Sequence, residues 1–391
     1  MLEYNQNICP IILALLIIMR GVGEKIFNIT LHIDFTMFLP FFASYHHPSS
    51  RLNMKKHYQI LALAFSLVAT IPIEAQTQAT SNPVGYITVN VPAGAVGAPS
   101  YTTLSIPLNN AAVFSGTIAS VDSATQIMLN GAAWTTDQFI ATPYLARVTS
   151  GSNTGRFFRI TANTANRLTV DFDATPTITT LVGTLSVGDS VSIVPANTLA
   201  SIFGATSPVL VTGASASQAD NLFILNGPGL GWGTYFHNGA NWRKAGSAAN
   251  QNNAVIYPDE GLLVVHIGTS AVNLKFSGSV PNTNEKTDLS GTGSTFAAMR
   301  FPVDTQLSAV GFELTAGWLP GGTAGAADNV WAWSASLNQW EQFYYTGSFW
   351  KKAGSIANQN ARLLTAGSAV IVIRNGTTTT TTLSQALPYT P

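Results

Sequence analysis

Cysteine is nearly absent from this chain. Among its 391 residues the only cysteine is Cys9, which lies in the N-terminal segment that we expect to be missing from the mature protein. Disulfide bonds therefore cannot hold the mature chain together, and both thiol catalysis and a cysteine-based metal site are excluded. Its stability must come from packing and hydrogen bonding.

Charge is equally scarce. Only 9% of the residues are charged, and 18 Lys and Arg balance 18 Asp and Glu, so the formal net charge is zero. No cluster of Lys and Arg occurs, which excludes a basic nucleic-acid-binding surface. A neutral surface makes association with further copies of the chain, or with other envelope proteins, plausible.

Catalytic signatures are missing as well. There is no G-x-S-x-G motif, and the glycine-rich stretch 227–233 lacks the Lys-Ser/Thr of a phosphate-binding loop. Asp171 and Asp173 stand two apart, but too few oxygen ligands surround them for calcium. Only His237 and His266 follow residue 76. The sequence therefore predicts a protein that is not an enzyme and that holds no cofactor or metal.

The N-terminal region has the pattern of a targeting segment. Residues 54–75, MKKHYQILALAFSLVATIPIEA, join a basic start to an apolar run and end in a small residue, as secretory signal peptides do. We therefore interpret 1–53 as an over-extended start and Met54 as the true one. The alternative is a membrane anchor at 10–19, which is short for a span of about 20 residues. Cleavage would leave an extracellular, cell-surface or periplasmic protein without a stable membrane span.

Strand-like segments fill the rest of the chain. Residues 86–91 and 157–160 are typical of them: they are rich in Val, Ile, Thr and Phe and are bounded by Gly, Asn and Asp. Helical patterns are confined to 198–203 and 295–299. We expect an all-β fold in which residues 83–195 form a small N-terminal β-barrel or sandwich domain.

The sequence also repeats itself. Residues 219–252 align without gaps on 327–360, an offset of 327 − 219 = 108, and 14 of the 34 pairs are identical. The match is clearest between WRKAGSAANQN, which begins at Trp242, and WKKAGSIANQN, which begins at Trp350. An offset this long is not that of a solenoid, so it predicts two homologous β-rich modules. We assign the modules to residues 196–281 and 282–391.

Beyond these stretches the alignment continues after a two-residue deletion, which matches 261–267 with 367–373. This alignment matches His266 with Val372 and puts Asp259-Glu260 into a loop of the first copy only. It also places the threonine run 377–382 in the last strand of the fold.

Each copy is expected to contain an aromatic hairpin. Asn238-Gly239 favours a two-residue turn, which places Tyr235 opposite Trp242. The same geometry in the second copy places Phe343 opposite Trp350. Asp220 and Asp328, each followed by Asn, are expected to close local turns with their side chains.

Aromatic and amide side chains are the candidate binding residues. Exposed Trp would favour polysaccharide binding by stacking on sugar rings, whereas buried Trp would be core. The Asn and Gln of the shared AGSxANQN stretch would either satisfy their own backbone, as a connector, or face one ligand or partner. The candidates are Trp232, Tyr235, Trp242, Asn250, Gln251, Asn252, Trp340, Phe343, Trp350, Asn358, Gln359 and Asn360.

Several stretches carry a family resemblance. They are NPVGYITVNVPAG (82–94), TLSIPLNNAAVFSGTIASV (103–121), VTSGSNTGRFFRITANTANRLTV (148–170), VGDSVSIVPANTLASIFG (187–204) and NWRKAGS (241–247). Together they resemble an uncharacterised family of secreted proteins from Verrucomicrobia-type bacteria. The resemblance implies export and a repeated β-architecture, and it implies no reaction.

These observations favour a secreted or cell-envelope protein with a structural or interaction role, self-associating through sheet edges. The alternative is a glycan-binding surface protein that uses exposed Trp as platforms.

Overall fold

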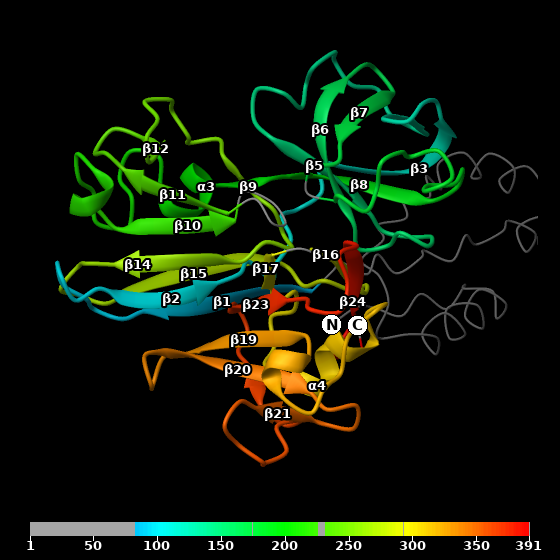
Figure 1. The fold of residues 1–391 in the computed structure, drawn as a ribbon. Coiled ribbons are helices and arrows are strands. Elements are labelled where there is room, and N and C mark those ends of the chain that lie inside the picture. The colour runs from blue at the N-terminus through cyan, green and yellow to red at the C-terminus, as the bar shows by residue number, and fades with distance from the viewer. Residues whose placement is uncertain (1–82, 174, 226–230, 292, 391) are drawn as a thin grey trace, which may run out of the picture. The chain divides into compact units, whose positions relative to one another are not determined.

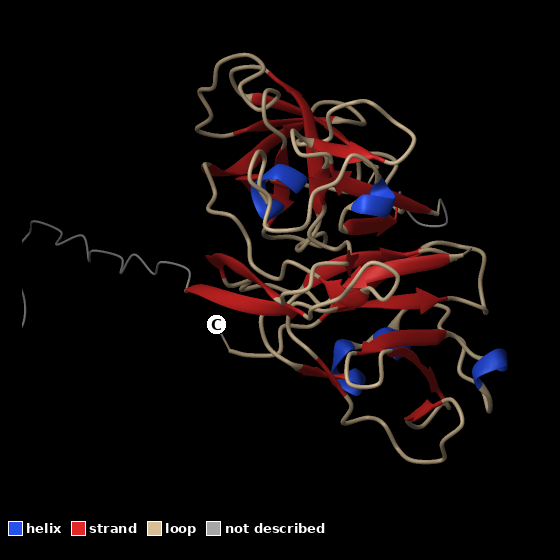
Figure 2. Ribbon diagram, turned by 90° about the vertical axis from the view of Figure 1, so that its left-hand side faces the viewer, coloured by secondary structure: helices blue, strands red, loops and turns tan. Residues whose placement is uncertain are grey.

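A computed structural model describes the chain over residues 83–173, 175–225, 231–291 and 293–390. These residues form an all-β fold, in which strands are joined by loops and by short helical turns (Figure 1). Figure 2 shows how little of the structure is helical. The all-β class predicted from the sequence is confirmed.

A closed barrel occupies the chain from Phe114 to Pro195 (Figure 1). Its strands follow the order β3-β4-β7-β6-β5-β8. They are β3 (Phe114–Val121), β4 (Gln126–Leu129), β5 (Tyr144–Val148), β6 (Phe157–Asn163), β7 (Arg167–Asp171) and β8 (Ser190–Pro195). Alternating side chains such as Ile127 and Leu129 of β4 fill its interior, as the two-residue period of a strand requires.

The first module has a sheet in the order β12-β11-β10-β14-β2 and a separate strand pair, β1-β15. These strands are β1 (Val84–Val91), β2 (Ser100–Leu104), β10 (Asn221–Leu225), β11 (Trp232–His237), β12 (Trp242–Lys244), β14 (Leu262–His266) and β15 (Val272–Ser279). β1 and β2 fall in the range 83–195 expected for the N-terminal domain. They pair with β15 and β14 and not with barrel strands.

The second module has a sheet in the order β17-β23-β19-β20-β21 and a strand pair, β16-β24. These strands are β16 (Glu285–Leu289), β17 (Ser294–Ala298), β19 (Asn329–Ser334), β20 (Gln339–Tyr345), β21 (Trp350–Lys352), β23 (Ala369–Ile373) and β24 (Thr381–Gln385). The strand order around β19 mirrors that around β10 in the first module.

Short elements recur in the two modules with the same offset. β9 (Asn197–Thr198), α3 (Leu199–Phe203), η3 (Ala216–Gln218) and β13 (Val255–Ile256) belong to the first module. β18 (Thr305–Gln306), α4 (Leu307–Val310), η5 (Ala324–Ala326) and β22 (Leu363–Leu364) begin 108 residues later, for example 307 − 199 = 108. η4 (Phe312–Leu314) follows α4. β9 pairs with β13, and β18 pairs with β22.

The strand register shows that the deletion expected between the copies was wrong. Asn221 lies opposite Val265, and Asn329 lies opposite Ile373, so the offset of 108 persists into β14 and β23. The counterpart of His266 is therefore Arg374, since 374 − 266 = 108. Apolar strands of Val, Ile and Leu match each other in several registers, which is why sequence similarity misplaced them.

Two local expectations are corrected and one is confirmed. The helical pattern at 198–203 is α3, but the one at 295–299 lies in strand β17, because pairing with β23 overrides local propensity. Of the threonine run 377–382, only Thr381 and Thr382 enter strand β24.

The hairpin register also differs from the expected one. The loops span four residues, so Trp242 lies opposite His237 and Trp350 lies opposite Tyr345. In the first loop Asn238 Oδ1 accepts hydrogen bonds from the N–H groups of Ala240 and Asn241. This side-chain closure stabilises a longer loop than the Asn-Gly pair predicts.

No helix in the described residues is long and apolar enough to span a membrane. The predicted signal peptide at 54–75, the over-extended start at 1–53 and most of the glycine-rich stretch 227–233 lie outside the described residues.

Candidate functional site

The first connector, residues 247–252, makes its hydrogen bonds within its own module. Asn252 Oδ1 accepts the backbone N–H of Trp242 at 2.9 Å, and the N–H of Gln251 donates to the Trp242 carbonyl at 2.8 Å. Asn250 Oδ1 accepts the N–H of Asn252 at 2.8 Å. Two of the three amides therefore satisfy backbone groups with their side chains.

The second connector, residues 355–360, repeats these contacts. Asn360 Oδ1 accepts the N–H of Trp350 at 2.8 Å, Asn358 Oδ1 accepts the N–H of Asn360 at 2.8 Å, and the N–H of Gln359 donates to the Trp350 carbonyl at 2.8 Å. The rings of Trp242 and Trp350 are fully buried in the cores of the first and second modules. The connectors thus hold the backbone of the central core tryptophans.

The remaining sequence candidates do not gather at one place. Phe343 is buried in the core of the second module, and Trp340 is half-buried against Phe296. Trp232 is 40% exposed, and its ring meets Phe296 edge-on at a centroid distance of 5.2 Å. Tyr235 lines a cavity beside Phe296. Among the described tryptophans Trp232 is the one with an exposed side chain.

Asp220 and Asp328 join distant segments and do not close the local turns expected of them. Asp220 lies 2.6 Å from His266 Nδ1, and Asp328 lies 2.7 Å from Arg374 Nε. Both carboxylates are buried at equivalent positions, so the same structural contact is made with a different partner in each module. The local turn in the first module is closed by Asn221, whose side-chain amide donates to the Ala219 carbonyl.

A cavity of about 270 Å³ lies where the barrel and both modules meet. β6 and the segment after β7 contribute Arg159 and Asp173 from the barrel. The first module contributes β10, β11 and the turn between β13 and β14, and the second contributes β16 and β17. The polar lining is Arg159, Asp173, Asp259, Glu260, Thr287, Thr295 and Asp288, and the aromatic lining is Tyr235, Tyr257 and Phe296.

Two acidic residues that are adjacent in the sequence, Asp259 and Glu260, line the cavity. Burial raises the pKa of Asp259 to about 6, although the nearby Arg300 opposes this effect. Burial, and then the neighbouring Asp259, raise the pKa of Glu260 well above its usual value. Burial also raises the pKa of Tyr257, with a further contribution from Asp171. Asp259 and Glu260 therefore lose hydration in this cavity without forming an ion pair with a described residue.

The carboxylate of Asp288, by contrast, forms an ion pair and accepts hydrogen bonds. Its carboxylate lies 3.1 Å from Arg156 Nη1 and accepts hydrogen bonds from the hydroxyl groups of Thr177 at 2.6 Å and Thr382 at 2.9 Å. The neighbouring Thr287 is only 2% exposed, and its hydroxyl has no hydrogen-bond partner among the described residues.

Sequence reasoning missed this site. Its parts lie as far apart as Arg159 and Phe296, and the misplaced deletion made Asp259-Glu260 resemble an ordinary loop. With the correct offset their counterparts are Gly367-Ser368, so the acidic pair belongs to one module only. No group of His, Cys, Asp and Glu in the described residues has the arrangement of a metal site.

A second feature of interest is the outer edge of β1. This strand pairs with β15 along its whole length, and its other backbone edge makes no hydrogen bond to any described residue. Its sequence, VGYITVNV, carries no charge, and Val84 and Tyr86 are 76% and 77% exposed. An open edge of this kind is a template for pairing with another strand.

No family model, curated protein or solved structure matches this chain. The function must therefore be argued from the geometry.

Proposed function

We propose that this protein is an exported, non-enzymatic interaction protein that associates with a second copy of itself through the edge of β1. The observation that carries the proposal is the uncharged open edge of β1. Natural edge strands are normally protected by charge, proline, a bulge or a cover, and β1 has no charged or proline residue within it.

Because β1 has no charged residue, a second copy of the chain is a better partner for its edge than a strongly charged protein. Two β1 strands can pair antiparallel about a twofold axis, which would join the two β1-β15 pairs into one sheet. The formal net charge of zero provides no long-range repulsion between copies. The exposed Val84 and Tyr86 would gain burial in the same step.

Light scattering coupled to size-exclusion chromatography of the exported protein tests this proposal. We expect a dimer or larger species for the unmodified protein and a monomer for the double variant Tyr86→Lys/Thr88→Lys, because lysines on an edge strand disfavour pairing. Ile356→Lys is the matched control, since Ile356 is 92% exposed in the second connector. A monomer at every concentration in the unmodified protein, or a variant that associates as strongly as the control, would contradict the proposal.

Export rests on the signal-like segment 54–75 and on the family resemblance. Peptide mapping of the exported protein should find its N-terminus after residue 75 and no peptide from residues 1–53. We also infer that the two modules arose by duplication, which the common offset of their elements supports.

Glycan binding is the second candidate function, and the exposed ring of Trp232 favours it. Added polysaccharide should quench Trp fluorescence in the unmodified protein and not in Trp232→Ala. Equal quenching in both, or none in either, would exclude a platform at Trp232.

A further inference from the structure

The cavity between the barrel and the modules has more negative than positive charge left without a partner. Asp173, Asp259 and Glu260 line it, and Arg159 is the single cationic residue in the described lining. The other cations near Asp259 are already held: Arg156 lies 3.1 Å from Asp288, and Arg300 lies 2.6 Å from Glu285.

The fold does not require the two central acids. In the second module Gly367-Ser368 occupy the positions of Asp259-Glu260, and the Gly367 carbonyl accepts the N–H of Ser105. In the first module the N–H of Ala298 donates to the Asp259 carbonyl. Backbone atoms make these contacts, and the Glu260 carboxylate also accepts the N–H of Tyr257 at 3.5 Å.

A polar guest is also indicated by Thr287. Thr287 lines the cavity, and its buried hydroxyl has no hydrogen-bond partner among the described residues. A buried polar atom without a partner costs free energy unless something bound supplies one. This observation is independent of the carboxylates.

The other lining residues indicate which class of molecule the cavity would bind. Tyr235, Tyr257 and Phe296 contribute aromatic side chains to the lining, and Ile224 and Leu225 contribute aliphatic ones. We propose that this cavity binds a small organic cation, a primary amine on a short aliphatic chain, whose ammonium group is held by Asp259 and Glu260.

This binding depends on the ionisation of the two acids. The titratable and charged groups that face them or act on them are Arg156, Arg159, Asp171, Asp173, Tyr235, Tyr257, Asp288 and Arg300. With the pKa of Asp259 at about 6, the carboxyl takes up a proton as the pH falls below this value. Affinity for an amine should therefore fall from about pH 8 to about pH 5.

Titration calorimetry of the full protein with cadaverine tests the proposal, and pentanediol is the matched neutral ligand. We expect cadaverine to bind at about pH 8, and Asp259→Asn/Glu260→Gln to weaken its binding by at least about tenfold. Asp122→Asn, on the barrel surface, should bind as the unmodified protein does. Thermal unfolding of the double variant reports whether it is folded, and Asp259→Asn alone replaces it if it is not.

Three outcomes would overturn the proposal. They are the absence of cadaverine binding, equal binding by the acid-deleted variant, and equal affinity for pentanediol, which would mark a site for neutral polyols. The edge variant Tyr86→Lys/Thr88→Lys should retain cadaverine binding. A failure at the cavity is thus distinguishable from a failure of self-association.

Discussion

Buried charged side chains connect segments of this molecule that its sequence keeps far apart. Asp220 and Asp328 occupy equivalent positions, and each is paired with a residue 46 positions further along, His266 or Arg374. A buried carboxylate is tolerated only when it is paired and hydrogen-bonded, so each contact fixes the end of β14 or β23. Asp220 and Asp328 are therefore structural residues. Glu260 differs from them: its carboxylate accepts the backbone N–H of Tyr257 at 3.5 Å and forms no ion pair with a described residue.

At the residue scale we predict that stability falls as the pH rises through the titration of Asp259. The pKa of this carboxyl is raised from 3.8 to about 6 in the folded protein. The folded state therefore binds more protons than the unfolded state between these values, and rising pH favours unfolding. Asp259→Asn/Glu260→Gln should raise the melting temperature at about pH 8 and change it little at about pH 4.

Asp122 provides a control of opposite sign. Hydrogen bonds from Ser120 and Arg167 lower its pKa, so its contribution to stability is present above the unfolded pKa and is lost as the pH falls through the folded one. Asp122→Asn should therefore lower the melting temperature slightly at about pH 8 and have no effect in strong acid. If the double variant behaved like Asp122→Asn, the cavity acids would have partners that stabilise them.

At the scale of elements, the hairpins and connectors form one unit in each module. β11 and β12 carry Trp242 into the core, and the connector returns to bond the backbone of the same residue. The indole N–H of Trp242 donates to the Gly204 carbonyl at 2.8 Å, which ties this unit to the end of α3. The shared AGSxANQN stretch therefore has a structural use in both modules.

We predict that Asn252→Ala destabilises the protein by about 1–3 kcal/mol, because the Trp242 N–H loses its acceptor close to the core. Asn360→Ala should have a similar effect through Trp350. Asn253→Ala is the matched control, since Asn253 is exposed, and it should leave stability nearly unchanged. Urea unfolding measures the difference. Full stability combined with lost binding in Asn252→Ala would instead identify the connector as a binding loop.

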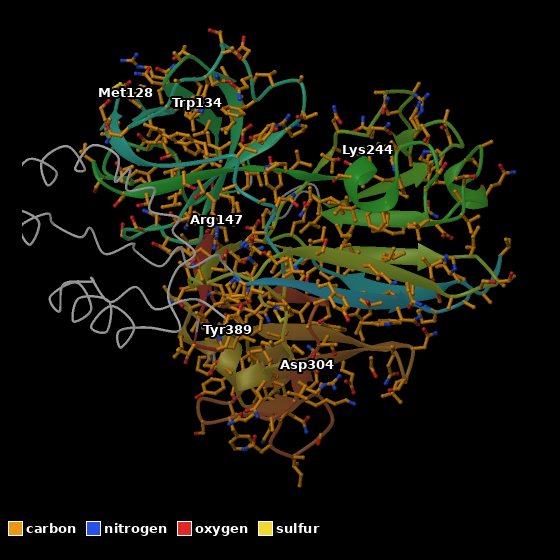
Figure 3. All side chains as sticks on the ribbon, turned by 180° about the vertical axis from the view of Figure 1, so that it is seen from behind. Met128, Trp134, Arg147, Lys244, Asp304 and Tyr389 are labelled. Carbon is orange, nitrogen blue, oxygen red and sulfur yellow. The ribbon has the colours of Figure 1, made fainter. Side chains whose placement is uncertain are left out.

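For the whole molecule, Glu285 is the central contact between the barrel and the second module. Its carboxylate is fully buried and lies 2.6 Å from Arg147 of β5 on one side and 2.6 Å from Arg300 on the other. Figure 3 shows Arg147 among the side chains beneath the barrel strands. Arg156–Asp288 adds a second buried pair between the same two parts.

We predict that Glu285→Gln costs about 3–5 kcal/mol, because it leaves two buried guanidinium groups without a full countercharge. Calorimetry should then show the barrel unfolding separately from the modules. Glu341→Gln is the control: Glu341 pairs with Lys352 and Arg362 inside the second module, so its loss should not separate the transitions. A single transition with an unchanged midpoint in Glu285→Gln would contradict this role.

Some features of this fold could be predicted from the sequence, and others could not. Strand-rich composition and Gly and Asn turns were enough for the all-β class and α3, because these depend on local patterns, but they left a barrel and a sandwich open as alternatives. The hairpin register failed because one Asn side chain closes a longer loop, and the alignment of β14 failed because apolar strands resemble each other in several registers. The cavity could not be predicted, since Arg159, Asp259 and Phe296 belong to three separate parts of the chain.

From its sequence alone this chain is recognisable as a weakly charged all-β protein with a single cysteine and two stretches of matching sequence, because composition and periodicity act over short distances. Tertiary structure alone decided that Asp220 and Asp328 are structural, that Asp259 and Glu260 share a cavity, and that the edge of β1 is open. These properties depend on which groups are desolvated together and which backbone edges find partners. Both depend on how strands that are distant in the sequence pair, and a local pattern of residues does not specify this pairing.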